Sequence, residues 1–173
     1  SIVKMITGAV LLDHQDFDPH LTQDCAGAYQ FGDRVFGCWL EQGHGKVNLT
    51  SAITQSCDVY FYRTIHYYDL DKLSKYFRKF GFGALTDVDI EGESKGIVPT
   101  TDYMNKRYGR FGWSTGALLN FSIGQGEILV TPMQVLNYTN ILASRGITSK
   151  PHFVMSEILS KNKDPLIPTE DWD

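Results

Sequence analysis

Apolar residues recur three or four positions apart in three parts of the chain, a spacing that predicts helices with one buried face. Residues 1–12 show it first and predict a buried helix at the start of the chain. Residues 70–80 repeat the pattern and are followed by glycine, a residue type that commonly ends helices. A third helix is predicted to begin at the Thr131-Pro132 pair and to stop at Gly146.

Two shorter helices are predicted between these long ones. Asn48 is placed to cap the first of them, because asparagine is among the preferred residues at a helix start. The second runs through residues 59–62 and follows a break at residues 56–58. The break is therefore flanked by helices on both sides.

Other parts of the chain lack helical periodicity. Residues 13–45 contain many glycines and polar side chains, which predict loops and a hairpin that turns at Gly32 and Asp33. A segment of this length with so little regular structure needs something to hold it. Residues 83–102 are expected to be irregular, and residues 147–158 to form a strand. No repeat or linker interrupts the chain, so a single domain is expected.

The composition is that of a soluble globular protein. Sixteen Lys and Arg stand against twenty Asp and Glu, which gives a net charge of −4. Nucleic acid is not expected as a partner, because its binding depends on a basic surplus. The longest apolar-plus-small run, residues 5–12, is far below the roughly 18 residues that cross a bilayer. Ser1 stands where an initiator Met would, which indicates that an earlier segment is missing.

Ser1 and Lys4 form the first candidate for chemistry. Their spacing places both on one helix face, so the amine can reach the hydroxyl. Serine becomes a good nucleophile when a base takes its proton, and a lysine whose pKa is lowered by burial is such a base. The pair is sufficient for acyl transfer. The same spacing recurs at Ser160 and Lys163, which we interpret as a solvated surface segment. The pattern at Ser1 gains weight only because an apolar helix follows it.

Ser56 and Asp58 form the second candidate, in the break between the two short helices. A hydroxyl there could pass a proton between Lys4 and a leaving group, and the carboxylate could hold Lys4 or a substrate amide. Taken alone, either residue is equally well explained as a helix cap.

The third candidate uses every cysteine in the chain. Cys25, Cys38, His44 and Cys57 supply three thiolates and one imidazole, a closed tetrahedral set that suits structural zinc. Such a site would pin the irregular segment with about 10 kcal/mol of folding-linked binding energy. The alternative is a Cys25–Cys38 disulfide with Cys57 as a small buried hydrophobic residue. An odd cysteine count and these spacings leave both open.

Five ordered blocks of residues form one series along the chain. They are Ser1 to Lys4; Phe36 to Trp39 with Gly43 to Gly45; Ser56 to Tyr62; Phe80 to Gly83; and Gly124 to Gly126 with Thr131 and Pro132. Over residues 1 to 153, the series resembles the transpeptidase domain of penicillin-binding protein 2, a class B, elongation-type family of Gram-negative bacteria. The resemblance implies an α/β (α+β) fold of the penicillin-recognising, β-lactamase-like type, here incomplete and mostly its helical part.

The resemblance also implies an activity. A serine-type D,D-transpeptidase of this family cross-links peptidoglycan stem peptides during cell elongation and rod-shape maintenance, and β-lactams inhibit it. Carried over by motif, Ser1 is the acylated nucleophile, Lys4 its proton acceptor, and Ser56 the serine of the second motif. Asp58 stands where most penicillin-recognising enzymes have Asn. The implied attack is on the carbonyl between two terminal D-alanines, followed by transfer to an amine.

Location, partners and metal follow from the same resemblance. It implies an inner-membrane protein with its catalytic domain in the periplasm, the residues of this chain being soluble. It also implies a SEDS-type glycosyltransferase partner, RodA, within an elongation complex. Some relatives are similar in holding zinc through positions that match Cys25, Cys38, His44 and Cys57, which favours zinc over the disulfide. The chain would then be part of a transpeptidase domain, with a zinc-binding insertion at residues 13–57.

One departure from the family pattern bears on activity. The third family motif, Lys-Thr-Gly or Lys-Ser-Gly on an edge strand, does not occur in these residues, although it helps form the oxyanion hole. The isolated chain is therefore expected to be inactive. Two other functions stay open: a penicillin-recognising sensor that is acylated without turnover, and a metal-stabilised structural domain with no chemistry at Ser1.

Overall fold

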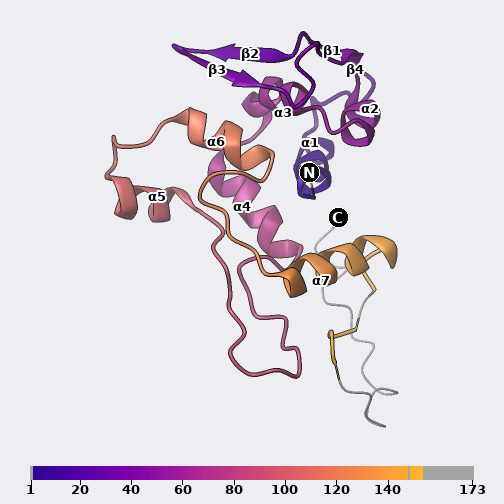
Figure 1. Ribbon diagram of the computed structural model, residues 1–173, viewed down its shortest axis with the longest axis vertical. Helices are drawn as coiled ribbons and strands as arrows, with labels where there is room; N and C mark the ends of the chain where they lie inside the picture. The colour runs from indigo at the N-terminus through magenta and orange to yellow at the C-terminus, as the bar shows by residue number, and fades with distance from the viewer. Residues whose placement is uncertain (1, 148, 154–173) are drawn as a thin grey trace. The chain divides into compact units, whose positions relative to one another are not determined.

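The computed structural model describes residues 2–147 and 149–153 of the 173 in the chain (Figure 1). The chain divides into two compact units. One comprises Ser1–Tyr76 with Pro99–Glu127, and the other comprises Phe77–Val98 with Ile128–Asp173. The predicted α/β character is confirmed, because helices dominate the described residues and are accompanied by a few short strands.

The first unit is built mainly from short helices. They are α1 (Lys4–Leu12), α2 (Leu49–Thr54), α3 (Asp58–Arg63), the 3₁₀ helix η1 (Ile65–Tyr67), α5 (Thr101–Tyr108) and α6 (Thr115–Ser122). The helix α4 (Leu70–Lys79) starts in this unit and continues into the second. Apolar side chains of α1 and α3, among them Ile6, Val10 and Phe61, are fully buried in its core. The Thr7 hydroxyl of α1 donates to the Ser122 carbonyl of α6 over 2.7 Å, which ties the two helices together.

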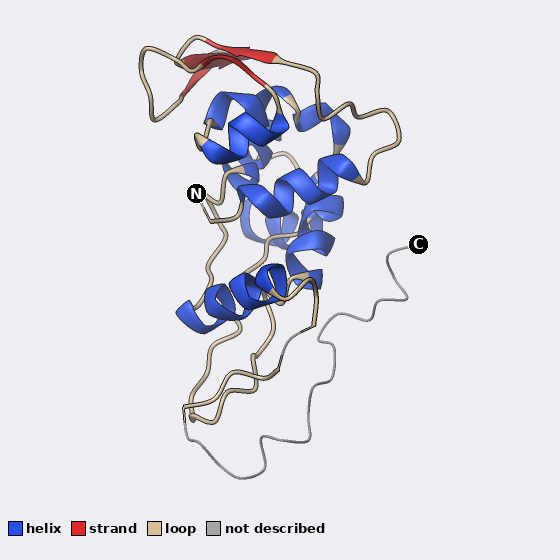
Figure 2. Cartoon of the chain, turned by 90° about the vertical axis from the view of Figure 1, so that its right-hand side faces the viewer, coloured by secondary structure: helices blue, strands red, loops and turns tan. Residues whose placement is uncertain are grey.

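Four short strands lie beside the helices of this unit (Figure 2). They are β1 (Gln23–Cys25), β2 (Ala28–Phe31), β3 (Arg34–Gly37) and β4 (Gly45–Val47). β2 and β3 form an antiparallel hairpin that turns at Gly32 and Asp33, as the sequence predicts. β1 pairs with β4 instead, which brings Cys25 beside the C-terminal end of the irregular segment at Gly45.

The break between α2 and α3 has a defined local geometry. Asn48 caps α2 by accepting a hydrogen bond from the Ser51 backbone, as predicted. α2 then ends and α3 begins at Asp58, with Ser56 between them in the left-handed region at φ 54°. Left-handed backbone is unfavourable for a residue with a Cβ atom, and such positions gather at functional sites.

The second unit contains α7 (Pro132–Ala143), which starts at the predicted Thr131-Pro132 pair. The Thr131 side chain caps the helix, and Gln134 completes a capping box. Gln134 is itself buried and donates to the backbone carbonyls of Ala84 and Lys95 over 2.7 and 2.8 Å. One α7 side chain therefore holds the predicted irregular stretch in place.

Two predictions of local structure need correction. α5 and α6 are absent from the sequence-based expectation, and α5 starts inside the stretch expected to be irregular. Met104 is the one buried residue of α5, so the helix carries almost no apolar stripe to detect. The strand expected at residues 147–158 is wrong as far as residue 153, because residues 147 and 149–153 have no strand; residue 148 and the remainder lie outside the described part. Within the described part, no helix has the length and apolarity to cross a membrane.

Candidate active site

Lys4 lies at the first residue of α1 with only 2% of its side chain exposed. Its ammonium nitrogen donates to the Ser56 carbonyl over 2.6 Å and contacts the Ser56 hydroxyl at 2.9 Å. The same nitrogen is 2.6 Å from the Asp58 Oδ1 atom. A buried ammonium is stable only when such partners replace its lost hydration. The fold therefore brings together three of the four residues that the sequence singles out, while Ser1 lies outside the described residues.

The carboxylate of Asp58 joins two segments at this point. Its Oδ1 atom faces Lys4, and its Oδ2 atom accepts a hydrogen bond from the backbone N–H of Trp39 over 3.1 Å. Asp58 is also the first residue of α3, where a negative charge is favoured by the helix dipole. The N-cap position of α3 is held by Cys57, without a side-chain cap hydrogen bond, while Ser56 and Asp58 contact Lys4.

This arrangement suits proton transfer. The Ser56 hydroxyl and the Lys4 amine are within hydrogen-bond distance, so a proton can pass between them without a change of position. Asp58 orients the amine in turn, which is the pattern of a base held by a third group. The site brings together an amine on α1, a hydroxyl in the break between α2 and α3, and a carboxylate at the start of α3.

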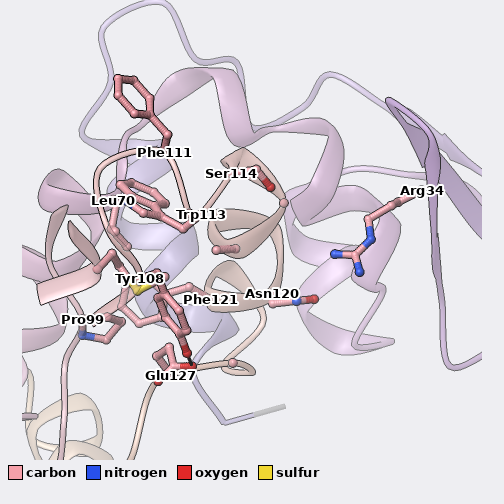
Figure 3. A pocket seen from close by; sticks show the side chains of 15 residues that line it. Arg34, Leu70, Pro99, Tyr108, Phe111, Trp113, Ser114, Asn120, Phe121 and Glu127 are labelled. Atoms are coloured by element: carbon pink, nitrogen blue, oxygen red, sulfur yellow. Dashed lines mark hydrogen bonds between the residues drawn. The ribbon is translucent and has the colours of Figure 1, made fainter. Parts of the chain in front are cut away.

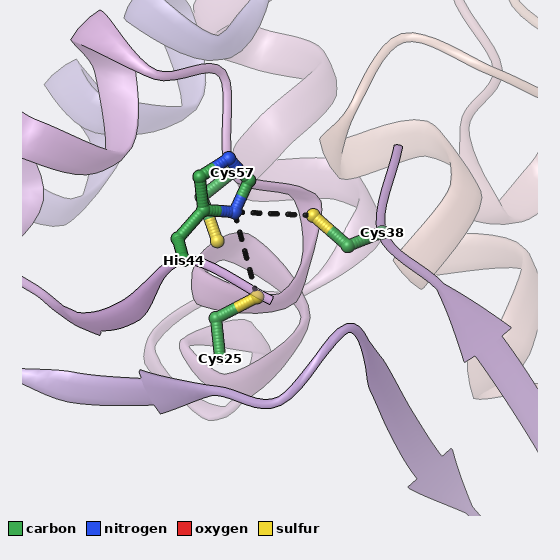
Figure 4. A group of neighbouring side chains, drawn as sticks. All are labelled: Cys25, Cys38, His44 and Cys57. Carbon is green, nitrogen blue, oxygen red and sulfur yellow. Dashed lines mark hydrogen bonds between the residues drawn. The ribbon is translucent and has the colours of Figure 1, made fainter. Parts of the chain in front are cut away.

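Cys25, Cys38, His44 and Cys57 lie together in the same unit (Figure 4). Their ligand atoms are all within 4.8 Å of one another. The His44 Nδ1 atom is 3.6 Å from the Cys25 sulfur and 3.5 Å from the Cys38 sulfur. Tetrahedral zinc, with bonds of about 2.0 Å to nitrogen and about 2.3 Å to sulfur, would hold such atoms about 3.5 Å apart. The four residues fit a metal ion.

The pKa values of two thiols in the cluster are shifted in opposite directions. Burial raises the pKa of Cys25, but hydrogen bonds to His44, Gly27 and Cys57 together outweigh it and bring that pKa down to about 7. Burial raises the pKa of Cys57 well above its ordinary value. All three cysteines are free thiols, so the structure does not contain the alternative Cys25–Cys38 disulfide. Since Cys57 lies between Ser56 and Asp58 in the chain, the cluster adjoins the Lys4 site.

Trp39 is a further residue of this region that the sequence reasoning did not single out. Its indole N–H donates to the Gln55 carbonyl over 3.0 Å, and its ring meets the His44 ring edge-on at 5.4 Å. Yet 62% of the residue is exposed. Two sequence signals could have drawn attention to it: its position next to Cys38, and its place at the end of the block from Phe36 to Trp39.

A separate hollow of about 380 Å³ lies elsewhere in the first unit (Figure 3). Aromatic side chains of α5, α6 and the loop between them form much of its wall, and Tyr108 donates to Glu127 at its edge. Lys4, Ser56 and Asp58 are not among its lining residues. This hollow is therefore distinct from the candidate active site.

The comparisons with known proteins bear on this geometry. The family model described as the penicillin binding protein transpeptidase domain matches residues 1–170. The chain belongs to the penicillin-binding protein transpeptidase family. It is 37% identical over 135 residues to the peptidoglycan D,D-transpeptidase MrdA of Haemophilus influenzae, and 31% identical over 156 residues to MrdA of Escherichia coli K12. These matches cover 76% and 90% of the chain.

Solved structures of the transpeptidase family share the fold of this chain. Penicillin-binding protein 2 of Helicobacter pylori matches with a TM-score of 0.85 and 40% identity, over 95% of this chain and 31% of that one. The complex of Pseudomonas aeruginosa PBP2 with WCK 5153 matches with a TM-score of 0.79 and 34% identity, over 88% and 35%. The expected penicillin-recognising fold is confirmed. The chain spans 21% and 24% of the length of the two curated relatives.

Proposed function

We propose that the protein carrying this chain is a peptidoglycan D,D-transpeptidase that works through a serine acyl-enzyme and serves cell elongation. The observation that carries the proposal is the contact of the buried Lys4 amine with Ser56 and Asp58 at a helix break, in a member of the transpeptidase family. A base held by a carboxylate and joined to a hydroxyl is what serine acyl transfer requires.

Each residue of the site has a proposed role. The Ser1 oxygen attacks the carbonyl between two terminal D-alanines while Lys4 accepts its proton. Ser56 passes a proton to the departing D-alanine amine, and the C–N bond breaks to leave an ester on Ser1. An amine of a neighbouring strand then attacks the ester, forms the new amide and returns Ser1 to its hydroxyl form. Asp58 keeps the Lys4 amine in place throughout. A β-lactam would acylate the same Ser1 oxygen.

Labelling with a fluorescent penicillin tests this function in a full-length protein that carries the chain. The wild type should be labelled at the serine that corresponds to Ser1, and Ser1→Ala should abolish the label. Lys4→Met should slow labelling by at least about 10²-fold, since general-base catalysis contributes 10² to 10⁴. With a stem-peptide donor ending in D-Ala-D-Ala in place of the penicillin, an acceptor amine should take up the acyl group as a cross-linked product while D-alanine is released. Penicillin labelling with no transfer of the peptide acyl group to an amine would favour a sensor, and no labelling at all would refute the proposal.

The cysteine–histidine cluster is proposed to hold structural zinc through Cys25, Cys38, His44 and Cys57. The Nδ1-to-sulfur distances support this, because they match the spacing of ligands around one tetrahedral ion. A zinc ion with four protein ligands supplies stability to the fold. Protein purified without added metal should contain close to one zinc per chain, and a chelator should lower its melting temperature sharply. Metal-free protein with a Cys25–Cys38 disulfide would contradict the assignment.

The setting of the protein is part of the proposal. Residues 13–57 would form a zinc-binding insertion in a transpeptidase domain of which this chain is a part. The catalytic domain would lie in the periplasm, held at the inner membrane, with RodA and the elongation complex as partners. One structural relative, PBP2 of H. pylori, is solved in complex with MreC and matches with a TM-score of 0.86. Co-purification of the full-length protein with RodA tests the partner.

A further inference from the structure

Trp39 combines two properties that seldom occur together. A tryptophan is usually well buried, yet 62% of this one is exposed. It is also fixed in place: the indole N–H is used by the Gln55 carbonyl, the ring edge meets His44, and the backbone N–H holds Asp58. An exposed surface tryptophan with no role would have no need of three such contacts. Its ring is therefore a rigid apolar surface that faces solvent.

Two hydrogen bonds fix where that surface lies relative to the candidate active site. Trp39 donates from its backbone to the carboxylate that holds the Lys4 amine. Its indole N–H donates a hydrogen bond to the carbonyl of Gln55, the residue directly before Ser56. Trp39 is thus hydrogen-bonded on both sides of the Ser56 turn, through its indole to Gln55 and through its backbone to Asp58. An acyl donor whose carbonyl reaches Ser56 and Asp58 therefore comes close to the residue that carries the indole.

We propose that Trp39 is a specificity-determining residue that contacts an apolar group of the acyl donor next to its reactive carbonyl. This assignment rests on the proposed transpeptidase function. The chemistry of the occupant follows from the indole, because its single polar N–H is already committed to Gln55. What remains exposed is a flat apolar face, which favours a ring or an alkyl group over a hydrogen-bonding one.

Two β-lactams that differ in one apolar group test the assignment in the full-length protein. Benzylpenicillin carries a phenyl side chain, and 6-aminopenicillanic acid lacks it. For each, the dissociation constant of the complex before acylation and the acylation rate constant are measured separately. Trp39→Ala should weaken the benzylpenicillin complex about tenfold, the size of one lost aromatic contact, and should leave 6-aminopenicillanic acid nearly unchanged. The acylation rate constants should stay within about threefold.

Trp39→Phe separates contact with the donor from support of the Ser56 turn. Phenylalanine keeps an aromatic face but cannot donate to Gln55, so binding of benzylpenicillin should stay within about threefold of the wild type. The control is Phe111→Ala, which removes an aromatic side chain that is 93% exposed and outside the candidate active site, and should change neither constant.

The outcomes are distinct. A loss confined to benzylpenicillin in Trp39→Ala, with Trp39→Phe close to the wild type, supports the assignment. An equal loss with both β-lactams, or a fall in the acylation rate constant in Trp39→Phe, overturns it and makes Trp39 a support of the Ser56 turn. Unchanged constants in Trp39→Ala also overturn it. If the wild type is not acylated by either compound, the proposed function fails and this assignment fails with it.

Discussion

Gly124 lies at a position with almost no room for a side chain. In the sequence it stands out only as the first glycine of a Gly-Gln-Gly motif. Its backbone has φ +82°, and a Cβ atom added there would lie 2.4 Å from the Cγ2 atom of Val3. Val3 is buried and directly precedes Lys4. The glycine therefore allows the Gly124 loop to pack against the start of the helix that carries the lysine.

The cost of Gly124→Ala can be worked from these two effects. Left-handed backbone costs an alanine about 1–2 kcal/mol. Forcing a methyl group into the Val3 side chain adds about 1–3 kcal/mol, the usual cost of overpacking. We therefore expect the free energy of unfolding to fall by about 2–5 kcal/mol. Because the clash pushes on the residue next to Lys4, penicillin labelling of the full-length variant should slow as well.

Gly126→Ala is the matched control. Its φ of +85° imposes the same backbone cost, but the nearest atom to its added methyl group is the Asn120 Cβ at 3.6 Å, an ordinary contact. The free energies of unfolding of the two variants, measured by urea denaturation, should therefore differ by the cost of the clash alone, about 1–3 kcal/mol. Val3→Ala should relieve the clash, because only the Val3 Cβ at 3.6 Å would then face the added methyl group. Equal losses for Gly124→Ala and Gly126→Ala, or additive effects of Gly124→Ala and Val3→Ala, would refute this reasoning.

Three further predictions concern the site and the core. In the full-length protein, Cys57→Ala should impair both stability and β-lactam acylation, since a metal at that sulfur would steady Ser56 and Asp58; normal acylation kinetics would separate metal from catalysis. Asp58→Ala should lower the free energy of unfolding by about 3–5 kcal/mol because it strands the buried Lys4 charge, and Asp58→Asn should cost less; equal urea midpoints for both would contradict this. Burial raises the pKa of Tyr60 to about 12, with Tyr67 and Asp18 contributing, from an ordinary value of 10.0. Its contribution to stability should therefore be complete below pH 10 and lost between pH 10 and pH 12, which tyrosinate absorbance recorded together with circular dichroism will detect; ionisation near pH 10 in the folded protein would disprove it.

Much of the local structure was open to prediction from short stretches of the chain. The Asn48 cap, the Gly32-Asp33 turn and the Thr131-Pro132 helix start all appear as expected. Each depends on interactions within a few residues, so the residue types alone are sufficient to specify them. α5 escaped prediction because it buries only Met104 and leaves no apolar stripe in the sequence.

The candidate site shows where local reasoning stops. The sequence by itself named Lys4, Ser56 and Asp58, because their residue types and order resemble a family pattern. Their contact spans 52 and 54 residues of chain, and only the packing of α1 against α2, and of α2 against α3, brings the Lys4 amine to 2.6 Å from the Asp58 carboxylate. The roles of Trp39 and Gly124 were equally beyond prediction. A hydrogen bond to a distant carboxylate and the lack of room for a methyl group beside Val3 are properties of packed neighbours, and a linear pattern of residue types does not record which neighbours meet.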